Sequence, residues 1–483
     1  MEQIGRDAAS RKSPGGGAIG WADLGPPLFA ALAWAAAAAL ARAHGLSAVS
    51  DDDFARVTIA QRFAHAPSLD PSGTSWLPFP FWTTGLAMIA FGRSLAVAHG
   101  VAIAQAAASG VLLFLAGRRA GVGAASATLG ALLPLALPLD RVLAAATVPE
   151  VPTAALVAYA IFAVRTAPLS AGCAALAASL SRYEAWPAAA LVAVGLLAST
   201  SREQRSRAAI GAALALAGPA AWVGWNAFAH GDALHFAHRV AGYRAGLGVA
   251  RDASAYGAAL LREGGVLVAL AAISVAALGR DGRARFGLAV AACVLLVATP
   301  TVAALAGGAP THHPERAVIA VFFLASVLAA GAGPEAALAI PRVRPFSAVI
   351  LAVTTIVFFG ARRVPATWSS LGPARGDELA LGRAVAAELP PGERFLLVPT
   401  SFGYLATIAA IGRPEDARAI VRRSVDPRSA LESDPFDSRS GLEAAASREG
   451  ARWVVAEGAQ AASLSSIGVV AIPLPGGALG RMR

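Results

Sequence analysis

The chain has 483 residues, of which 56% are hydrophobic and only 14% are charged. Soluble domains carry roughly 25% charged residues, so this composition excludes an ordinary soluble protein and favours burial in a membrane. The formal net charge is +10, but the arginines lie in short segments between apolar runs, where such residues set membrane topology. This placement excludes a nucleic-acid-binding protein, despite the basic balance.

The N-terminal residues and the two cysteines give further information about the class of membrane protein. Residues 1–25 begin as a polar, glycine-rich stretch without an apolar core. They are predicted to be a disordered cytoplasmic N-terminus rather than a cleavable signal peptide, with the first helix kept as an anchor. Cys173 and Cys293 both lie inside apolar runs, so no disulfide framework is predicted.

Apolar runs recur through residues 26–361, which are predicted to form one all-α polytopic membrane bundle. About eleven of these runs approach the roughly 20 apolar residues that a transmembrane helix needs. The predicted spans are 26–43, 94–116, 122–139, 150–164, 168–181, 185–199, 208–228, 256–278, 286–306, 316–333 and 346–361.

The arginines predict the orientation of these spans, because cytoplasmic loops carry an excess of basic residues. With the N-terminus in the cytoplasm, every basic cluster falls on the cytoplasmic side of the bacterial inner membrane. The clusters contain Arg118, Arg119, Arg165, Arg202, Arg205, Arg207, Arg280, Arg283, Arg285, Arg342 and Arg344. The longer polar segments then face outward: 44–93, 229–255, 307–315 and the residues after 361.

Segment 44–93 is too long for a simple turn. Its aromatic and proline residues between Trp76 and Trp82 are typical of a helix that lies in the membrane interface. A juxtamembrane helix is therefore predicted in this first outer loop. The alternative is a complete span, which would invert every later loop and place the arginine clusters outside.

Residues 362–483 differ in character, because charged residues and proline or glycine turns become frequent. Strands are predicted at 394–400 and 451–458, alternating with helices. This alternation indicates a small α/β domain. An odd number of spans places it on the extracytoplasmic face.

Three adjacent carboxylates, Asp51, Asp52 and Asp53, follow the first predicted span directly. Neighbouring carboxylates raise one another's pKa unless a cation or a hydrogen-bond donor compensates. A positioned carboxylate is also what a general base requires to take a proton from a hydroxyl. The alternative is a solvated loop that caps the following helix.

Further charged residues lie at the outer ends of other spans. Glu150 stands between two prolines, a costly position if the carboxylate merely faces lipid. Arg182 and Glu184 occupy a tight hairpin between two short apolar runs, where the arginine could grip a lipid-linked phosphate. Glu150 could instead be a charge at a helix start, and Arg182 and Glu184 a surface pair.

His312, His313, Glu315 and Arg316 converge at the start of the tenth predicted span. The arginine could neutralise a phosphate leaving group, and a histidine could donate a hydrogen bond to it. No spacing here matches a structural zinc site. No metal or other cofactor is predicted to be required; a site that also binds a divalent cation is the alternative.

The pattern resembles the GT-C-type polytopic glycosyltransferases, in which the first outer loop carries an acidic pair followed by a proline- and aromatic-rich stretch. The corresponding stretches here are D-D-D-F-A-R and L-P-F-P-F-W. P-E-V-P at 149–152 is similar to the second acidic site of these enzymes. H-H-P-E-R at 312–316 resembles an element of the lipid-phosphate-mannose-dependent mannosyltransferases.

The resemblance implies a membrane glycosyltransferase with a sugar on polyprenyl phosphate as donor. The acceptor would be a lipid-linked glycan, a glycolipid or a protein hydroxyl on the outer face. Among the three aspartates, Asp52 would be the base of an inverting transfer, while Arg182 and Arg316 would hold the departing phosphate. The alternatives are a transporter or flippase for a lipid-linked or polar solute, and a non-catalytic membrane scaffold.

Overall fold

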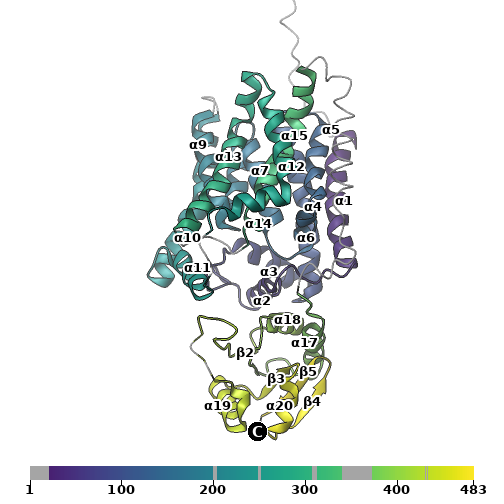
Figure 1. Ribbon diagram of the computed structural model, residues 1–483, viewed down its shortest axis with the longest axis vertical. Helices are drawn as coiled ribbons and strands as arrows, with labels where there is room; N and C mark the ends of the chain where they lie inside the picture. The colour runs from purple at the N-terminus through teal and green to yellow at the C-terminus, as the bar shows by residue number, and fades with distance from the viewer. Residues whose placement is uncertain are drawn as a thin grey trace, which may run out of the picture.

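The computed structural model describes residues 21–199, 204–248, 252–306, 313–339, 373–429, 431 and 433–482. These residues form a helical bundle with a small mixed sheet near the C-terminus (Figure 1). The predicted class, mostly helical with a small C-terminal α/β part, is confirmed at this level. The eleventh predicted span, 346–361, the boundary predicted at residue 362, and His312 lie outside the described residues.

Each of the first ten predicted spans corresponds to a helix of the bundle. These helices are α1 (Trp21–Ala43), α4 (Leu95–Arg119), α5 (Ala124–Leu132), α7 (Glu150–Ala163), α8 (Pro168–Ser179), α9 (Trp186–Ser199), α10 (Arg205–His230), α12 (Ala255–Ala276), α13 (Arg280–Leu305) and α15 (Ile319–Ala339). After α5, the chain continues through η1 (Leu133–Ala136) into α6 (Pro138–Ala145) with a bend of 88°.

Five helices in the described part of the chain are long and apolar enough to cross a membrane, namely α1, α4, α10, α12 and α13. A sixth crossing is obtained if the bent pair of α5 with η1 and α6 counts as one span. Helices α7, α8 and α9, with 12 to 14 residues, and the stretch Ile319–Gly333 of α15 are apolar but shorter. A helix rises 1.5 Å per residue, so α7, α8 and α9 reach less far than a full span, and the count of about eleven spans remains a prediction.

Helix α7 runs through the interior of the bundle. Every residue from Val157 to Ala163 is buried, and three of these seven residues are alanines. Small residues also allow close packing of α8 on α10, where a Cβ added to Gly172 would lie 2.3 Å from the carbonyl oxygen of Gly211. Such close contact between backbones is typical of helices packed in membranes.

Four further helices gather at the end of the bundle that faces the sheet: α2 (Asp51–His65), α3 (Phe79–Phe91), α11 (His235–Gly246) and α14 (Pro314–Ala317) (Figure 1). Segment 44–93 therefore forms two helices where one was predicted in the membrane interface. Helix α2 begins with its acidic residues in the first turn, which the helix dipole favours. Pro80 lies in the first turn of α3, where its fixed φ suits a helix start.

The C-terminal part contains a five-stranded sheet with the order β2-β1-β3-β5-β4. Strand β1 pairs in parallel with β2 and β3, whereas β5 pairs antiparallel with β3 and β4. The strands are β1 (Phe395–Leu397), β2 (Ala417–Ala419), β3 (Trp453–Glu457), β4 (Ala471–Leu474) and β5 (Gly477–Arg481). Strands β1 and β3 fall in the two segments where the sequence predicts strands.

Helices cover both faces of this sheet, since successive side chains of a strand point to opposite faces. Leu396 of β1 packs toward α19 (Arg439–Glu449) and α20 (Gln460–Ser466), which follow the short η5 (Pro435–Asp437). Phe395 and Leu397 pack toward α17 (Gly376–Glu388) and α18 (Tyr404–Ile411). Figure 1 shows that α17 and α18 form the layer nearest the bundle.

The described residues from 373 to 482, which we call the sheet part, pack directly against α2. Phe54, Val57 and Ala60 of α2 share a buried apolar cluster with Ala406 and Ala409 of α18. Polar contacts join the same two surfaces: the Gln61 Nε2 donates to the Ala409 carbonyl oxygen at 2.9 Å. Arg93, just beyond α3, pairs with Glu415 at 2.7 Å. The residues at the start of α2 are therefore held from both sides, by the bundle and by the sheet part.

Candidate functional site

The three aspartates at the start of α2 have three different environments. Asp53 is buried, and its Oδ2 accepts backbone N–H groups of Val49 and Ser50 at 3.1 and 3.2 Å. Its Oδ1 accepts the backbone N–H of Thr147 at 2.8 Å and lies 3.2 Å from the Thr147 hydroxyl. Burial raises the pKa of Asp53 despite these bonds. This carboxyl thus caps α2 and ties it to the loop before α7.

Asp51 forms an ion pair with Arg375, which lies 324 residues later in the chain. The Arg375 Nε and Nη2 donate to the two oxygens of Asp51, both at 2.9 Å. This is the planar, two-bond geometry in which guanidinium and carboxylate interact most strongly. Asp51 therefore has its charge compensated by the residue that precedes α17.

Asp52 differs from both neighbours. Its side chain is 36% exposed, and its ion pair is a contact of 3.6 Å with the Nη1 of Arg316. Asp52 is thus the one aspartate of the three whose carboxylate is accessible and not engaged in close hydrogen bonds within the described residues. The resemblance in sequence favours Asp52 among the three, and this geometry supports Asp52 as the candidate for chemistry.

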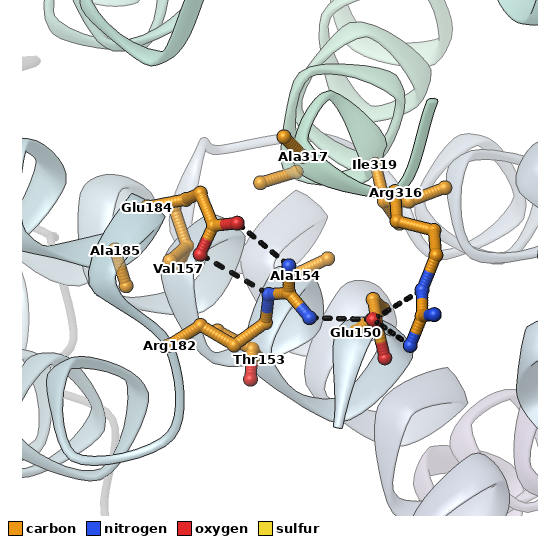
Figure 2. A pocket seen from close by; sticks show the side chains of 11 residues that line it. Glu150, Thr153, Ala154, Val157, Arg182, Glu184, Ala185, Arg316, Ala317 and Ile319 are labelled. Carbon is orange, nitrogen blue, oxygen red and sulfur yellow. Dashed lines mark hydrogen bonds and ion pairs between the residues drawn. The ribbon is translucent and has the colours of Figure 1, made fainter. Parts of the chain in front are cut away.

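Glu150, the first residue of α7, connects two arginines (Figure 2). Its Oε1 accepts a hydrogen bond from the Arg182 Nη1 and further bonds from the Arg316 Nε and Nη2, the latter two at 2.7 and 2.6 Å. The carboxylate is fully buried, and its Oε2 has no hydrogen-bond partner among the described residues. The side chains of Glu150, Arg182 and Arg316 are therefore in direct contact, although the three residues come from separate segments of the chain.

Arg182 lies between two carboxylates. It precedes the short helix η2 (Tyr183–Ala185), and its Nε and Nη2 donate to Glu184 at 3.2 and 2.6 Å. The hairpin is fixed by Tyr183, whose hydroxyl donates to the Ser75 carbonyl oxygen and accepts from the Trp222 Nε1. The predicted Arg182–Glu184 pair is present, but it belongs to a buried network rather than to an exposed surface.

Arg316 completes this network from α14. Its guanidinium is 5% exposed and also reaches the Ser50 hydroxyl at 3.3 Å, so it links α14 to the start of α2 and α7. His313 and Glu315 of the same motif pair with each other at 3.1 Å and do not line the cavity beside Glu150. The structure therefore brings Arg316, but not these two residues, into contact with the other candidates.

Arg56 is the residue of this site that the sequence analysis missed. Its guanidinium lies 4.5 Å from the ring centroid of Trp76 and 5.6 Å from that of Phe81, a cation–π arrangement. Its Nε is buried without a hydrogen-bond partner in the described chain. Burial lowers the pKa of Arg56 to about 10, against the opposing effect of the nearby Glu150 and Asp52 charges.

A sequence signal for Arg56 did exist. Residues four apart lie on the same face of a helix, so an arginine four positions after Asp52 on a helix that starts at Asp51 points the same way. Trp76, which belongs to the aromatic stretch predicted to lie in the membrane interface, stacks on Phe81 with ring centroids 6.2 Å apart and presents its ring to Arg56.

Two cavities adjoin the network. The first, with a volume of ≈ 20 Å³, lies among Glu150, Thr153, Arg182 and Arg316 (Figure 2) and has room for about one water molecule. The second has a volume of ≈ 190 Å³ and is mainly apolar. Residues that line it include Tyr183, Glu184, Trp186, Phe236, Ala237 and Pro300.

The larger cavity is walled by an aromatic cluster. Tyr183 and Phe236 stack with centroids 4.7 Å apart, and Trp186 packs edge-on against both rings. Glu184 lines both cavities. A small cavity lined by charged residues thus lies directly beside a larger, mainly apolar one. Among the described residues, no group of three His, Cys, Asp or Glu side chains is placed to hold a metal ion.

No protein-family model matches the chain, and no curated protein matches it in sequence. Two solved structures are similar in fold. ArnT from Cupriavidus metallidurans bound to undecaprenyl phosphate superposes with a TM-score of 0.60 at 14% identity, over 96% of this chain and 98% of that one. ArnT from the same organism in the apo state gives a TM-score of 0.53 at 14% identity, over 89% and 92%.

The shared fold confirms the structural part of the resemblance found in the sequence, because ArnT is a GT-C polytopic membrane glycosyltransferase. The similarity covers nearly the whole of both chains, including the sheet part.

Proposed function

We propose that this protein is a membrane glycosyltransferase that moves a sugar from a polyprenyl-phosphate donor to a hydroxyl acceptor. The acceptor would be a lipid-linked glycan, a glycolipid or a protein. The observation that carries the proposal is the network of Asp52, Arg316, Glu150 and Arg182, with Arg56 beside it. It joins an accessible carboxylate to buried cations at the end of the bundle that carries the sheet part.

Asp52 is proposed to be the general base. Its exposed carboxylate can approach an acceptor hydroxyl, whereas Asp51 and Asp53 are held by Arg375 and by backbone N–H groups. As the acceptor oxygen bonds to the anomeric carbon, the bond from that carbon to the phosphate oxygen breaks. The phosphate leaves with the electron pair, and the hydroxyl proton passes to Asp52. A single displacement of this kind inverts the anomeric centre.

The arginines are proposed to bind the departing phosphate. A guanidinium has five N–H donors, and the bonds of Arg182 to Glu150 and Glu184 use three of them. Arg316 likewise keeps donors beyond its bonds to Glu150 and Ser50. Arg56 is the most available of the three, because its buried Nε has no hydrogen-bond partner in the part of the chain that the structure describes. Donors fixed in advance where negative charge develops stabilise the transition state.

The ≈ 190 Å³ cavity is proposed to receive the first isoprenoid units of the donor lipid. Its aromatic walls match an unsaturated hydrocarbon chain, and Glu184 places its mouth beside Arg182. A phosphate held at the arginines would therefore have its lipid tail directed between α9, α11 and α13. Binding sites with a few polar groups at one end of an apolar cavity are usual for such amphiphiles.

The proposal includes the topology predicted from the arginines. The N-terminus lies in the cytoplasm, and residues 362–483, together with the site, lie outside the bacterial inner membrane. No resident cofactor is assigned. A divalent cation is not part of the proposal, which assigns the phosphate to the three arginines.

The test is transfer of labelled sugar from polyprenyl phosphate in membranes that contain the protein. Asp52→Asn should reduce transfer by about 10²–10⁴-fold, the usual contribution of a general base. Asp232→Asn is the matched control, because Asp232 is an exposed carboxylate beyond α10 that pairs with His238. Equal transfer by wild type and both variants would contradict the role of Asp52.

A transporter or flippase for a lipid-linked solute is the alternative function. The buried arginines could hold a lipid phosphate for movement across the membrane without any transfer. That function predicts that Asp52→Asn leaves lipid movement unchanged in reconstituted vesicles, while no labelled sugar reaches an acceptor with either protein.

A further inference from the structure

A second ion-pair group lies on the sheet side of the three aspartates. Arg375 bonds to Asp51 through Nε and Nη2, and its Nη1 donates to Glu378 of α17 at 2.9 Å. All three side chains are partly exposed, by 17 to 24%. Arg375 therefore connects the first turn of α2 to the first helix of the sheet part.

The loop after β1 closes over this group at Gly403. A Cβ at this glycine would lie 2.4 Å from the Glu378 Oε1 and 2.8 Å from the Arg375 Nη1. The absence of a side chain lets the loop pack directly on the ion pair. The position of Arg375 is thus fixed by α17, by Asp51 and by the loop that leads into α18.

Asp51 directly precedes Asp52 in the chain. Two adjacent carboxylates oppose each other's ionisation unless a cation compensates one of them. Asp53 has its oxygens satisfied by backbone N–H groups, so Asp51 is the neighbour of Asp52 whose charge is compensated by a close ion pair. Arg375 is the residue that makes this pairing.

We propose that Arg375 is a positioning residue that neutralises Asp51, so that the charge of Asp51 does not act on its neighbour Asp52, the proposed base. The sheet part thereby contributes to the reaction centre without touching the reacting atoms. This inference rests on the function proposed above, but its electrostatic core does not. The other charged or titratable groups that act on Asp52 are Arg56 on its own helix, Arg182 before η2, Tyr243 on α11 and Arg316 on α14.

The first experiment compares sugar transfer against pH for wild type, Arg375→Gln, Asp51→Asn and the double variant. Arg375→Gln should move the acid limb of the profile upward by about one pH unit, equivalent to a tenfold loss of transfer on that limb. Asp51→Asn leaves Arg375 as an uncompensated cation, so its acid limb should not move upward. In the double variant both charges are absent, so the profile should return to the wild-type position.

The matched control is Arg93→Gln. Arg93 also pairs with an acidic residue of the sheet part, Glu415, and its exposure is similar. Because this pair joins the same two surfaces away from Asp52, its loss should leave the pH profile in place. A double variant as slow as Arg375→Gln alone, or an equal shift in Arg93→Gln, would overturn the inference.

A second experiment requires no substrate. In protein with Cys173→Ala and Cys293→Ala, the variant Asp52→Cys carries a single thiol whose alkylation rate against pH reports the charge at position 52. Arg375→Gln should raise the midpoint of that titration, Asp51→Asn should reverse the rise, and Arg93→Gln should have no effect. An unmoved midpoint would overturn the inference. The expected shifts together with absent sugar transfer in wild type would support the role of Arg375 and refute the proposed function.

Discussion

Arg316 donates to Glu150 through both Nε and Nη2, at 2.7 and 2.6 Å, although the two residues are 166 positions apart. The pair joins the start of α7 to the short helix α14. Because the same carboxylate oxygen also accepts from Arg182, one buried acid fixes two cations. This arrangement gives the site its shape before any substrate binds.

Loss of Glu150 should destabilise the whole fold. Glu150→Ala leaves Arg182 and Arg316 buried without their shared counter-charge, and breaking a buried pair in this way typically costs about 3–5 kcal/mol. The measurement is the thermal unfolding midpoint of purified protein in detergent. The control is Glu443→Ala, which breaks the exposed Arg439–Glu443 pair and should leave the midpoint nearly unchanged. Equal midpoints for the two variants would contradict the role assigned to Glu150.

Replacement of Arg56 should weaken binding of the proposed donor but have little effect on the stability of the fold. Hydrogen bonds to charged groups contribute roughly 1.5–3 kcal/mol, so Arg56→Ala should weaken donor use by about 10–100-fold. The guanidinium makes no hydrogen bond within the described chain at Nε, so folding should suffer far less. Steady-state kinetics with varied donor provide the measurement. Arg62→Ala, an exposed position on the same helix, should behave as wild type.

Filling the aromatic cavity should distinguish long from short donors. Ala237 lines the cavity, and Ala237→Trp would occupy much of its ≈ 190 Å³. We expect KM to rise for a long-chain polyprenyl donor and to change little for a water-soluble short-chain donor. Ala245→Trp, at an exposed position of the same helix, is the control. An equal loss with both donors would show that the cavity does not hold the lipid tail.

The sheet part contains a buried carboxyl with a definite pH signature. The Thr407 hydroxyl donates to the Glu457 Oε1 at 2.6 Å, and burial raises the pKa of Glu457 above its ordinary value of 4.5. The folded state therefore holds this proton more tightly than the unfolded state, so the stabilisation is fully present at low pH. It is lost as the pH rises from about 4.5 through the raised value.

The check is the difference in unfolding midpoint between wild type and Glu457→Gln across this pH range. The wild-type protein should lose stability relative to Glu457→Gln as the pH rises, because the amide cannot ionise. Glu388→Gln, at an exposed position of α17, should show no such trend. A difference that stayed constant with pH would contradict the assignment.

Much of the fold was predictable because lipid and water impose simple rules on composition. The first ten apolar runs became helices, and the runs around Phe395 and Trp453 became strands. The number of helices that cross the membrane was harder to predict from the sequence. Helices such as α7 are apolar but short, because prolines and charged residues limit their length, and hydropathy alone does not determine whether a short buried helix crosses the membrane.

The candidate site was predictable only as separate pieces. Asp52, Glu150, Arg182 and Arg316 each stood out as charges at the ends of apolar runs. Their pairing depends on tertiary packing, which no local pattern encodes. Arg56 was missed because a lone arginine on a polar helix is usually solvated. The link between Asp51 and Arg375 was missed because 324 residues separate them.

The burial of most of α7 has a consequence for substitutions within this helix. Glu150 is the terminal residue of that helix, so a slide of one residue along its axis would displace the carboxylate by about 1.5 Å. Misplacement of about 1 Å can cost a hundredfold in rate. Bulkier side chains in place of the buried residues Ala158 or Ala160 would therefore reduce the proposed transfer, although neither residue touches the site. The small side chains inside α7 thus set the position of Glu150 relative to the two arginines that it binds.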